Sequence, residues 1–435
     1  MDTSITKAEF TAAIQKLSAQ FAAETWDSLV DKGELRGSDQ AFRASGGRFL
    51  REVLGRAWSA AAAKQEVRRT CSCGGDVEFR EIRPVVLHTV LAGRDVEVKA
   101  KYVQCGTCRS GGFPLLAALH ADAEGFTESL RALSLLAGVV EPYESASSTL
   151  LGRFADVRVS EEKIQSLVAQ FGEAARKWLH DPNRKRPLPT TETGAPLYVG
   201  IDGGMAFVDG RWQEVKVGCA FDGSERVESE KGRGALTNRQ VVAVRGDPQQ
   251  LGTLLTALFT ASLAAHKQVV VLGDGAPWIW NLVAEIFPNR LEILDWFHAD
   301  EHISTVAKTL YAEGSPEAER WRAVQLEYLA HDEVDHVIES LRFLERSLRG
   351  GKRKIVAELA AYFSRNCTRM LYETYRKRGL HIGSGCVESA VGHVVQQRMK
   401  RNGMRWKASG ADHMLALRSV YRSEGTWDPL IRAAA

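Results

Sequence analysis

The spacing of hydrophobic and polar residues divides the chain into regions of different character. Residues 1–65 combine Ala and Leu with charged side chains and predict an N-terminal helical region. Residues 66–125 contain β-prone stretches, and the helical period returns over residues 126–180. Residues 181–196 contain four prolines and no periodicity, which predicts a linker between folded parts.

Short apolar and alternating runs follow the linker. The runs at residues 197–202, 214–221 and 240–244 have the length and spacing of three strands. Asp247 and Pro248 then suit the N-cap and the first turn of a helix, in which leucines recur at i, i+3, i+4 and i+7. This spacing predicts a helix with one buried face.

Two more strands continue the alternation. A buried run at residues 268–274 and a second run at residues 291–295 flank a helix at residues 280–287. Three strands, a helix, a strand, a helix and a strand follow the order of the ribonuclease H-like fold. We therefore expect residues 197–299 to form the first part of an α/β core of that class.

The chain then becomes helical for a long stretch. Residues 300–378 have a helical pattern throughout and predict an all-helical region. A turn at residues 383–385 leads into a helix that carries Glu388. Residues 379–435 are expected to complete the core with this helix and a C-terminal basic segment.

Whole-chain properties limit the function only loosely. At 435 residues the chain is long enough for two to four folding units, and 44% hydrophobic and 26% charged residues are ordinary for a globular protein. A net charge of +3 does not by itself indicate nucleic acid. No apolar run approaches the roughly 20 residues that cross a bilayer, and the N-terminus lacks an apolar signal core. We expect a cytoplasmic protein.

Two acids end predicted strands, and a third lies downstream. Asp202 and Asp274 each close an apolar run, and the ligand crevice of an open α/β sheet lies at such strand ends. With Glu388 they offer the hard oxygen ligands that two Mg²⁺ or Mn²⁺ ions require, roughly 3.5–4 Å apart. Each acid also has an ordinary interpretation: an Asp before Gly is often a turn residue, and Glu388 suits the first turn of a helix.

Asp295 is an alternative to Asp274 as the second metal ligand. It ends the fifth predicted strand, so it could replace Asp274 as a metal ligand. We interpret Asp295 and His298 as residues that position the ligands or the DNA, although His298 could also be a hydrogen-bonded core histidine. His302 lies one turn further on, but nothing else in that stretch completes a zinc site with the two histidines.

Four of the seven cysteines form two tight pairs separated by about thirty β-prone residues, whereas Cys219, Cys367 and Cys386 are scattered alone. Four thiolates complete a closed, structural zinc shell, so we expect a zinc-ribbon-like module over residues 66–125. Two reduced pairs without metal are the alternative. The four predicted ligands are Cys71, Cys73, Cys105 and Cys108. Nearby cations favour DNA contact, namely Arg68, Arg69, Arg80, Lys99 and Lys101.

Residues 143–154 and 160–171 predict two short helices with a turn near residues 156–157. Ser160 is a natural N-cap for the second helix. This arrangement is typical of a helix-turn-helix that reads DNA. An ordinary helical hairpin is the alternative, because the exposed face of the second helix, which includes Lys163, is not strongly basic.

A basic segment lies directly downstream of Glu388. Five cations and one Trp would neutralise phosphates and stack on a base, as is recurrent in DNA-binding sites. A solvated basic helix end is the alternative. The predicted DNA-binding residues are Arg398, Lys400, Arg401, Arg405, Trp406 and Lys407.

Five sequence motifs together resemble those of a known family. The motifs at residues 198–205, 270–280, 295–298, 382–389 and 403–406 are similar to those of the ISKra family of bacterial insertion-sequence transposases. The likeness covers nearly the whole chain. The acid and histidine at residues 295–298 also resemble a motif that follows the fifth strand in Mutator-like and related transposases.

The resemblance implies a DDE-type DNA transposase with Asp202, Asp274 and Glu388 as its triad. It also implies that the helical stretch at residues 300–378 is an insertion inside the catalytic domain. Such an enzyme uses divalent metal to hydrolyse a phosphodiester at the element end, and then joins the freed 3′-hydroxyl to target DNA. It implies double-stranded DNA as partner, a nucleoid-associated location, and a homodimer or higher assembly that holds two ends.

Two other functions share these features. A zinc-ribbon DNA-binding regulator could keep the catalytic fold without activity, and a nuclease could cut without strand transfer. The complete set of acids with glycine-flanked motifs favours an active transposase over the regulator. The large N-terminal half argues against a plain nuclease, which needs no end-reading region.

Overall fold

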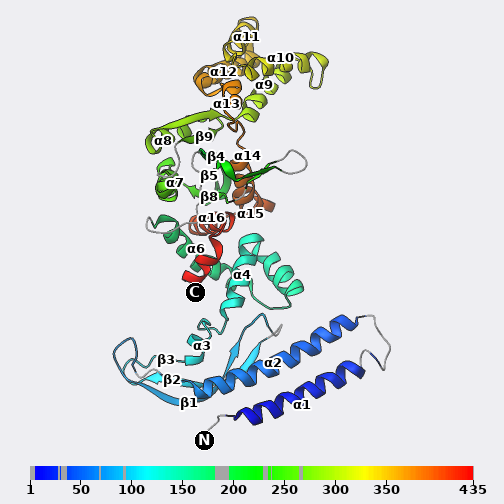
Figure 1. Ribbon diagram of the computed structural model, residues 1–435, viewed down its shortest axis with the longest axis vertical. Helices are drawn as coiled ribbons and strands as arrows, with labels where there is room; N and C mark the ends of the chain where they lie inside the picture. The colour runs from blue at the N-terminus through cyan, green and yellow to red at the C-terminus, as the bar shows by residue number, and fades with distance from the viewer. Residues whose placement is uncertain are drawn as a thin grey trace. The chain divides into compact units, whose positions relative to one another are not determined.

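The computed structural model describes residues 5–27, 30, 37–67, 70–91, 95–181, 195–228, 234–236, 238–263 and 268–434. The chain forms two compact units that divide between Val168 and Ala169, and each is described by itself (Figure 1). Most of the expected linker, residues 182–194, lies outside the described residues, as do Arg68 and Arg69. No helix among the described residues is long and apolar enough to cross a membrane.

The first unit begins with two long helices, as the sequence predicts. Helix α1 (Lys7–Trp26) starts at a capping box, in which the Thr6 hydroxyl accepts from the Glu9 N–H and the Glu9 carboxylate accepts from the Thr6 N–H. Helix α2 (Ser38–Lys64) runs alongside it (Figure 1). The Phe21 ring joins the two helices by packing on rings of α2.

A small antiparallel sheet follows, with strands β1 (Val77–Leu87), β2 (Val96–Cys105) and β3 (Gly111–Gly112) in that order. Alternate residues of β2 are buried because one face of the strand carries α2 and α3 (Pro114–Ala118). Buried apolar side chains fill this core, namely Ala62, Leu87, Val96, Val98, Ala100 and Leu115.

The two helices predicted for a helix-turn-helix are present after α4 (Glu128–Val140). The first is α5 (Tyr143–Ser145) continued by the π-helix η2 (Ala146–Phe154). The second, α6 (Glu161–His180), extends nine residues past the predicted end. The Ser160 hydroxyl accepts from the Lys163 N–H at 3.2 Å, as expected of an N-cap.

The second unit is built on a five-stranded sheet, and all five predicted strands occur in it. Their order is β10-β9-β4-β5-β8, with antiparallel pairing of β4 with β5 and β5 with β8, and parallel pairing of β4 with β9 and β9 with β10. A two-stranded ribbon pairs β6 (Arg226–Glu228) with β7 (Gly234–Leu236). The strands are β4 (Leu197–Val208), β5 (Arg211–Asp222), β8 (Gln240–Arg245), β9 (Val269–Gly273) and β10 (Arg290–Leu294).

Helices cover both faces of this sheet. On one face lies α7 (Pro248–Leu263), where a Cβ on Gly218 would come within 2.8 Å of Leu255, and α8 (Pro277–Ile286) packs against α7. On the other lie α14 (Gly385–Val391) and the π-helix η5 (Gly392–Gln396). Gly200 lets α14 approach, because a Cβ there would meet Val387 at 2.9 Å. Helices α15 (Gln397–Met399), α16 (Ala408–Arg422) and α17 (Trp427–Ala434) complete the unit.

The stretch predicted to be helical, residues 300–378, is helical throughout and joins the sheet at the β10 edge. The Tyr372 hydroxyl donates to the carbonyl of Leu294 at 3.1 Å, and Arg369 pairs with Glu292 at 2.5 Å. These contacts fix the helices to the strand that precedes them. The helices are α9 (Trp296–Leu310), α10 (Pro316–Ala330), α11 (Val334–Ser347), α12 (Gly350–Asn366), η4 (Cys367–Arg369) and α13 (Tyr372–Lys377).

Candidate functional site

Three neighbouring strands of the sheet each place an aspartate at the same level. Gly273, the last residue of β9, is paired with Ile201 of β4 on one side and with Leu294 of β10 on the other. The residue after each of these three is an aspartate. They are Asp202, Asp274 and Asp295.

Asp202 is not at the end of its strand, which corrects the expectation from the sequence. Strand β4 continues to Val208, because beyond Ile201 it remains paired with β5 as a hairpin while its parallel pairing with β9 ends. Asp202 is therefore the first β4 residue past the parallel pairing. Its carboxylate accepts from the Gly203 N–H at 2.6 Å.

The electrostatics of Asp202 tie the acids together. Burial is the largest cause of its raised pKa, and the negative charges of Asp274 and Glu388 raise the pKa further. The Gly203 N–H and a positive charge on His298 act in the opposite direction. The carboxyl groups of the predicted triad therefore interact through space, and His298 lies among them.

Asp274 sits in a tight turn held by its neighbours. One carboxylate oxygen accepts from the Ala276 N–H at 2.9 Å, and the Tyr362 hydroxyl of α12 donates to the Asp274 carbonyl at 2.6 Å. Gly275 is required between them: its φ is +95°, and a Cβ there would come within 2.7 Å of the Tyr362 ring. Burial and the charge of Asp274 raise the pKa of Tyr362, which keeps its hydroxyl protonated as a donor.

Asp295 is fully buried, and both of its oxygens accept hydrogen bonds. One accepts from the Phe297 N–H at 2.7 Å, which makes Asp295 the N-cap of α9. The other accepts from the Ser384 N–H at 3.0 Å and from the Ser384 hydroxyl. These bonds hold the segment that enters α14, so Asp295 anchors the helix of Glu388.

The atoms that could hold a metal group differently from the predicted triad. Ligand atoms of Asp295, His298 and Glu388 lie within 4.8 Å of one another. Among the described residues, the carboxylates of Asp202, Asp274 and Glu388 do not meet at that distance as a trio. We call the five side chains Asp202, Asp274, Asp295, His298 and Glu388 the acidic pocket; ligand atoms of the last three lie within 4.8 Å of one another.

The two histidines occupy the same helix face. His298 is 3.6 Å from Glu301, and the His302 ring packs edge-on against Tyr362 with 4.3 Å between ring centroids. Burial lowers the pKa of His302, as does a positive charge on His298. Among the described residues, no third ligand completes a metal site with this pair.

Cys219 of β5 and Cys386 of α14, which the sequence leaves as single cysteines, form a disulfide. Their separation of 167 residues explains why spacing gave no indication of the pair. Cys386 lies two residues before Glu388, so the bond fastens the Glu388 helix to the sheet. Cys367 remains a free thiol.

The four cysteines predicted to bind zinc come together. Their sulfur atoms lie within 4.8 Å of one another, with Cys71 3.7 Å from Cys108 and Cys73 3.6 Å from Cys105. Gly75 has no room for a side chain, because a Cβ would come within 3.0 Å of the Cys105 sulfur. Such a cluster of four thiols suits a tetrahedral zinc shell.

Backbone amides prepare two of these thiols for metal. The N–H of Cys73 is the main cause that lowers the pKa of Cys71 to about 6. The Cys108 N–H likewise lowers the pKa of Cys105. The Ser110 N–H lowers the pKa of Cys108, but the other three thiols overcome it and raise that pKa to about 11. Binding of a cation would release the protons that remain on these crowded thiols.

Two of the predicted DNA-binding residues are structural instead. Arg398 is only 2% exposed and its guanidinium lies over the Trp406 ring at 5.1 Å, so it is enclosed by its own segment and cannot reach a phosphate. The Trp406 indole N–H donates to the Met399 carbonyl at 3.0 Å, and its backbone pairs with Phe207 and Asp209. Trp406 therefore anchors the segment to β4.

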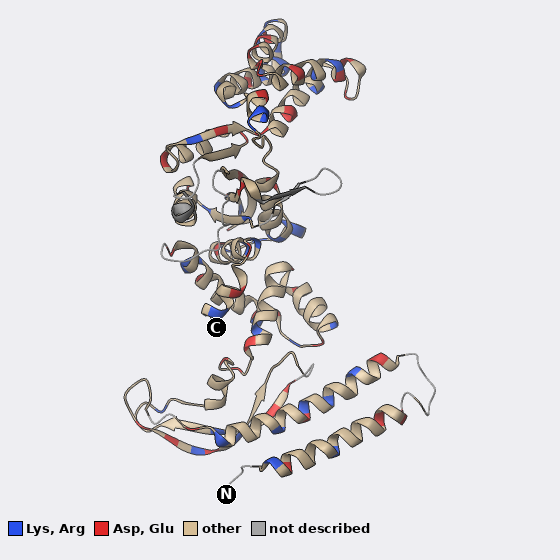
Figure 2. Ribbon diagram, in the orientation of Figure 1, with Lys and Arg blue, Asp and Glu red and all other residues tan. Residues whose placement is uncertain are grey.

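The remaining cations of the segment are exposed, namely Lys400, Arg401, Arg405 and Lys407, and Figure 2 shows Lys and Arg grouped around α15. Lys400 lies 5.4 Å from the Trp212 ring, and Arg405 lies 5.6 Å from the Phe207 ring. Trp212 is 54% exposed. No sequence motif marked Trp212, because its place opposite Phe207 depends on the β4–β5 register.

Lys163 of α6 does not face solvent, which corrects its predicted place on an exposed face. Its ammonium pairs with Asp122 at 2.8 Å and Glu124 at 3.1 Å and lies 4.5 Å from the Phe126 ring. The exposed face of α6 thus loses a cation. The helical pair has no basic recognition face among the described residues of α6 up to Val168.

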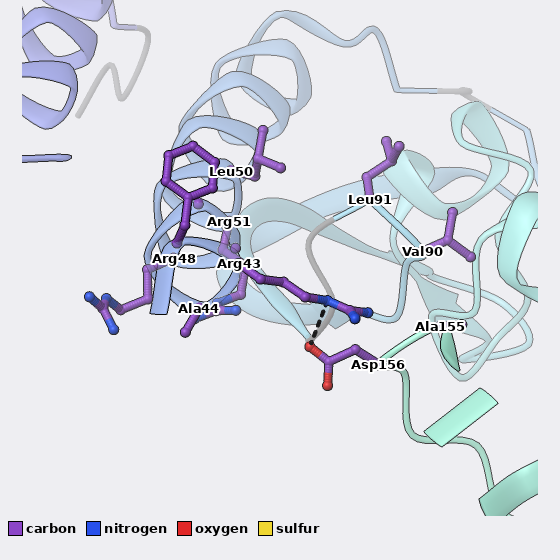
Figure 3. A pocket seen from close by; sticks show the side chains of 12 residues that line it. Arg43, Ala44, Arg48, Leu50, Arg51, Val90, Leu91, Ala155 and Asp156 are labelled. Atoms are coloured by element: carbon purple, nitrogen blue, oxygen red, sulfur yellow. Dashed lines mark ion pairs between the residues drawn. The ribbon is translucent and has the colours of Figure 1, made fainter. Parts of the chain in front are cut away.

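A cavity of about 420 Å³ in the first unit lies between α2 and the segments around Val90 and Asp156 (Figure 3). Figure 3 shows Arg43 reaching from α2 toward Asp156, 4.0 Å away, and the same side chain donates to the Phe154 carbonyl at 3.3 Å. Of the 12 residues that line the cavity, none belongs to the predicted sites.

Comparison with known proteins gives one family. No curated protein matches the chain. A family model described as "Uncharacterised protein family (UPF0236)" matches residues 77–430, which include the acidic pocket, the disulfide and two of the four clustered cysteines. Because the match covers most of the chain, the protein belongs to the uncharacterised protein family UPF0236.

Proposed function

We propose that this protein is a DNA transposase of the ISKra type. It hydrolyses a phosphodiester at the end of an insertion sequence, and the freed 3′-hydroxyl then attacks a phosphodiester of target DNA. The observation that carries the proposal is the grouping of three acids. Asp202 and Asp274 lie at one level of the sheet, and the negative charges of Asp274 and Glu388 both raise the pKa of Asp202.

The fold supports a ribonuclease H-like core. Three antiparallel strands, β8, β5 and β4, are extended by two parallel ones, β9 and β10. The helical stretch α9–α13 enters between β10 and α14. We therefore assign α9–α13 as an insertion in the catalytic domain.

The acidic pocket has the chemistry of a divalent-metal site. The pKa of the partly buried Asp202 is raised by burial and by the negative charges of Asp274 and Glu388, a repulsive arrangement that a cation would relieve. Asp202, Asp274 and Glu388 would hold Mg²⁺ or Mn²⁺, with Asp295 and His298 beside Glu388. Bound there, two ions would stabilise the attacking and the leaving oxygen of an in-line displacement.

The exposed hairpin end beside the basic segment would carry DNA leaving the pocket. Phe207 lies five residues beyond Asp202 on β4, about 17 Å at roughly 3.3 Å per residue. Lys400 and Arg405 would pair with phosphates there, and the exposed Trp212 ring offers a stacking surface for a base. The four clustered cysteines would hold a structural Zn²⁺ as a zinc-ribbon-like support.

The test is strand cleavage on a labelled duplex taken from the DNA that flanks the coding sequence. The wild-type protein should nick this duplex when Mg²⁺ or Mn²⁺ is present, and Glu388→Gln should fold and bind it without nicking. Glu317→Gln, an exposed acid on α10, is the matched control and should nick normally. Normal nicking by Glu388→Gln would remove Glu388 from the catalytic set.

A second candidate function is that of a DNA-binding regulator, which keeps the catalytic fold without cutting. The observation that favours it is that the three acids do not meet within 4.8 Å as a trio, whereas Asp295 is occupied by hydrogen bonds. Binding of the same duplex with no nicking in either metal, by wild type and Glu388→Gln alike, would select the regulator.

A further inference from the structure

The turn between α11 and α12 carries an unusual concentration of positive charge. Residues 342–354 contain six cations and one carboxylate, a net charge of +5 in thirteen residues, whereas the whole chain has a net charge of only +3. All six cations are exposed. We call this segment the basic tip; its cations are Arg342, Arg346, Arg349, Lys352, Arg353 and Lys354.

Most of this charge is not neutralised within the protein. Arg353 lies 3.5 Å from Glu345, and Lys354 lies 3.9 Å from Glu358. Among the described residues, no carboxylate comes within ion-pairing distance of Arg346, Arg349 or Lys352. The tip therefore presents cations whose natural partner lies outside the described chain.

The placement of these cations works against the stability of α12. The N-terminus of a helix carries a partial positive charge and favours acids in its first turn. Helix α12 has no acid there, its N-cap Arg349 makes no side-chain cap hydrogen bond, and three consecutive cations follow at residues 352–354. A bound anion would relieve this repulsion and would also accept from the unpaired N–H groups of the first turn.

The same helix reaches the acidic pocket. Tyr362, ten residues after Lys352 on α12, donates its hydroxyl to the Asp274 carbonyl at 2.6 Å. Ten residues of helix span about 15 Å, and a duplex advances 3.4 Å per base pair, so the distance corresponds to about four or five base pairs. A rigid element thus links the tip to the site where a phosphodiester would react.

We propose that the basic tip binds the phosphate backbone of double-stranded DNA about four or five base pairs from the reacting phosphodiester. The proposal rests on the proposed function, since it takes the acidic pocket as the site of reaction. Unpaired Arg and Lys side chains with an open helix N-terminus recognise phosphate without reading sequence. The link through α12 to Asp274 favours DNA over other anionic partners.

The test measures DNA binding in full-length protein that carries Glu388→Gln, so that cutting does not interfere. A triple variant, Lys352→Gln, Arg353→Gln and Lys354→Gln, is compared with its parent on a 30-base-pair duplex over a range of salt concentrations. We expect Kd to rise about tenfold or more near 0.15 M salt, and the slope of log Kd against log salt to fall by about 2 to 3. The melting temperature should stay equal or rise, because the cations oppose the helix dipole.

A matched control removes the same number of charges from the same helical stretch. Lys308, Arg320 and Lys377 are also exposed but lie outside the basic tip, so changing all three to Gln should leave the slope at the parent value. A second variant, Arg346→Gln with Arg349→Gln, serves if the triple variant fails to fold, and it should lower the slope by about 2.

Three results would overturn the proposal: an unchanged slope in the tip variants, an equal loss in the control, or a selective loss of binding to phosphatidylserine vesicles with DNA binding intact. The outcomes also separate this proposal from the transposase proposal. A wild type that nicks DNA while its tip variants bind normally would overturn only the tip. A protein that binds duplex through the tip but never nicks would overturn only the transposase.

Discussion

Ser384 donates two hydrogen bonds, from its backbone N–H and from its hydroxyl, to one carboxylate oxygen of the buried Asp295. The same hydroxyl lies 3.1 Å from Glu388. A hydroxyl has one proton to donate, so while Asp295 holds it the Glu388 carboxylate remains free to accept a cation. Asp295 therefore acts on the site through the segment that positions Glu388.

This arrangement predicts different outcomes for the two candidate second ligands. Asp295 accepts hydrogen bonds from the Phe297 N–H and from the N–H and hydroxyl of Ser384. In Asp295→Asn, the amide NH₂ would face one set of these donors and could not accept from it. The substitution should lower the free energy of unfolding by about 1.5–3 kcal/mol or more, as for hydrogen bonds to a charged group. Asp274→Asn should keep the melting temperature within a few degrees and abolish nicking. Thermal unfolding and the nicking assay on both variants check this, and the opposite pattern would make Asp295 the ligand.

The raised pKa of Asp202 predicts how stability depends on pH in the absence of metal. Burial and neighbouring negative charge favour its protonated form in the fold, so its contribution is fully present below the ordinary aspartate pKa and is lost as pH rises through the raised value. Between those two values, wild type in EDTA should lose melting temperature relative to Asp202→Asn. Added Mn²⁺ should raise the melting temperature of wild type and leave that of the variant unchanged. Parallel curves for the two proteins in EDTA would contradict the assignment.

The disulfide between Cys219 and Cys386 predicts a reductant-sensitive fold. It closes a loop of 167 residues and ties the Glu388 helix to β5. Its removal should cost about 2–4 kcal/mol of the free energy of unfolding. Dithiothreitol should therefore lower the melting temperature of wild type and leave a Cys219→Ala, Cys386→Ala double variant unchanged. Cys367→Ala is the control and should keep the sensitivity of wild type.

The cysteine cluster predicts one tightly bound zinc ion per chain. Elemental analysis should find zinc in wild type and none in Cys71→Ser. Acidification should release zinc, because protons compete with the metal for the four thiolates. Chelation should lower the melting temperature of the first unit, and Cys367→Ser should retain full zinc content. Absence of zinc in wild type would favour the reduced pairs.

The strands and the acids could be predicted from the sequence, because both are visible in its local pattern. Each of the runs before Asp202, Asp274 and Asp295 is apolar and ends in an acid, so strand and residue are visible together. Their alignment across β4, β9 and β10 depends on register, which no local pattern contains.

Long-range packing explains what the sequence could not predict. Arg398 follows the pattern of a basic DNA-binding segment, yet its guanidinium lies over Trp406, which is bound to β4. Lys163 suits an exposed helix face, yet it is enclosed by Asp122 and Phe126. For both Arg398 and Lys163, a contact with a residue outside their own helix determines whether the charged side chain is exposed.

The exposed Trp212 ring predicts a contact with unpaired bases near the acidic pocket. Trp212→Ala should weaken binding of a duplex with a single-stranded overhang by about 1–3 kcal/mol, roughly 5- to 150-fold in Kd, since a stacked base contributes that much. Binding of a blunt duplex should change less, because its bases are stacked on one another. Trp212→Phe keeps an aromatic ring and should recover most of the affinity. Fluorescence anisotropy on both probes checks this, and an equal loss on blunt and overhanging DNA would show that the ring serves the fold of the hairpin instead.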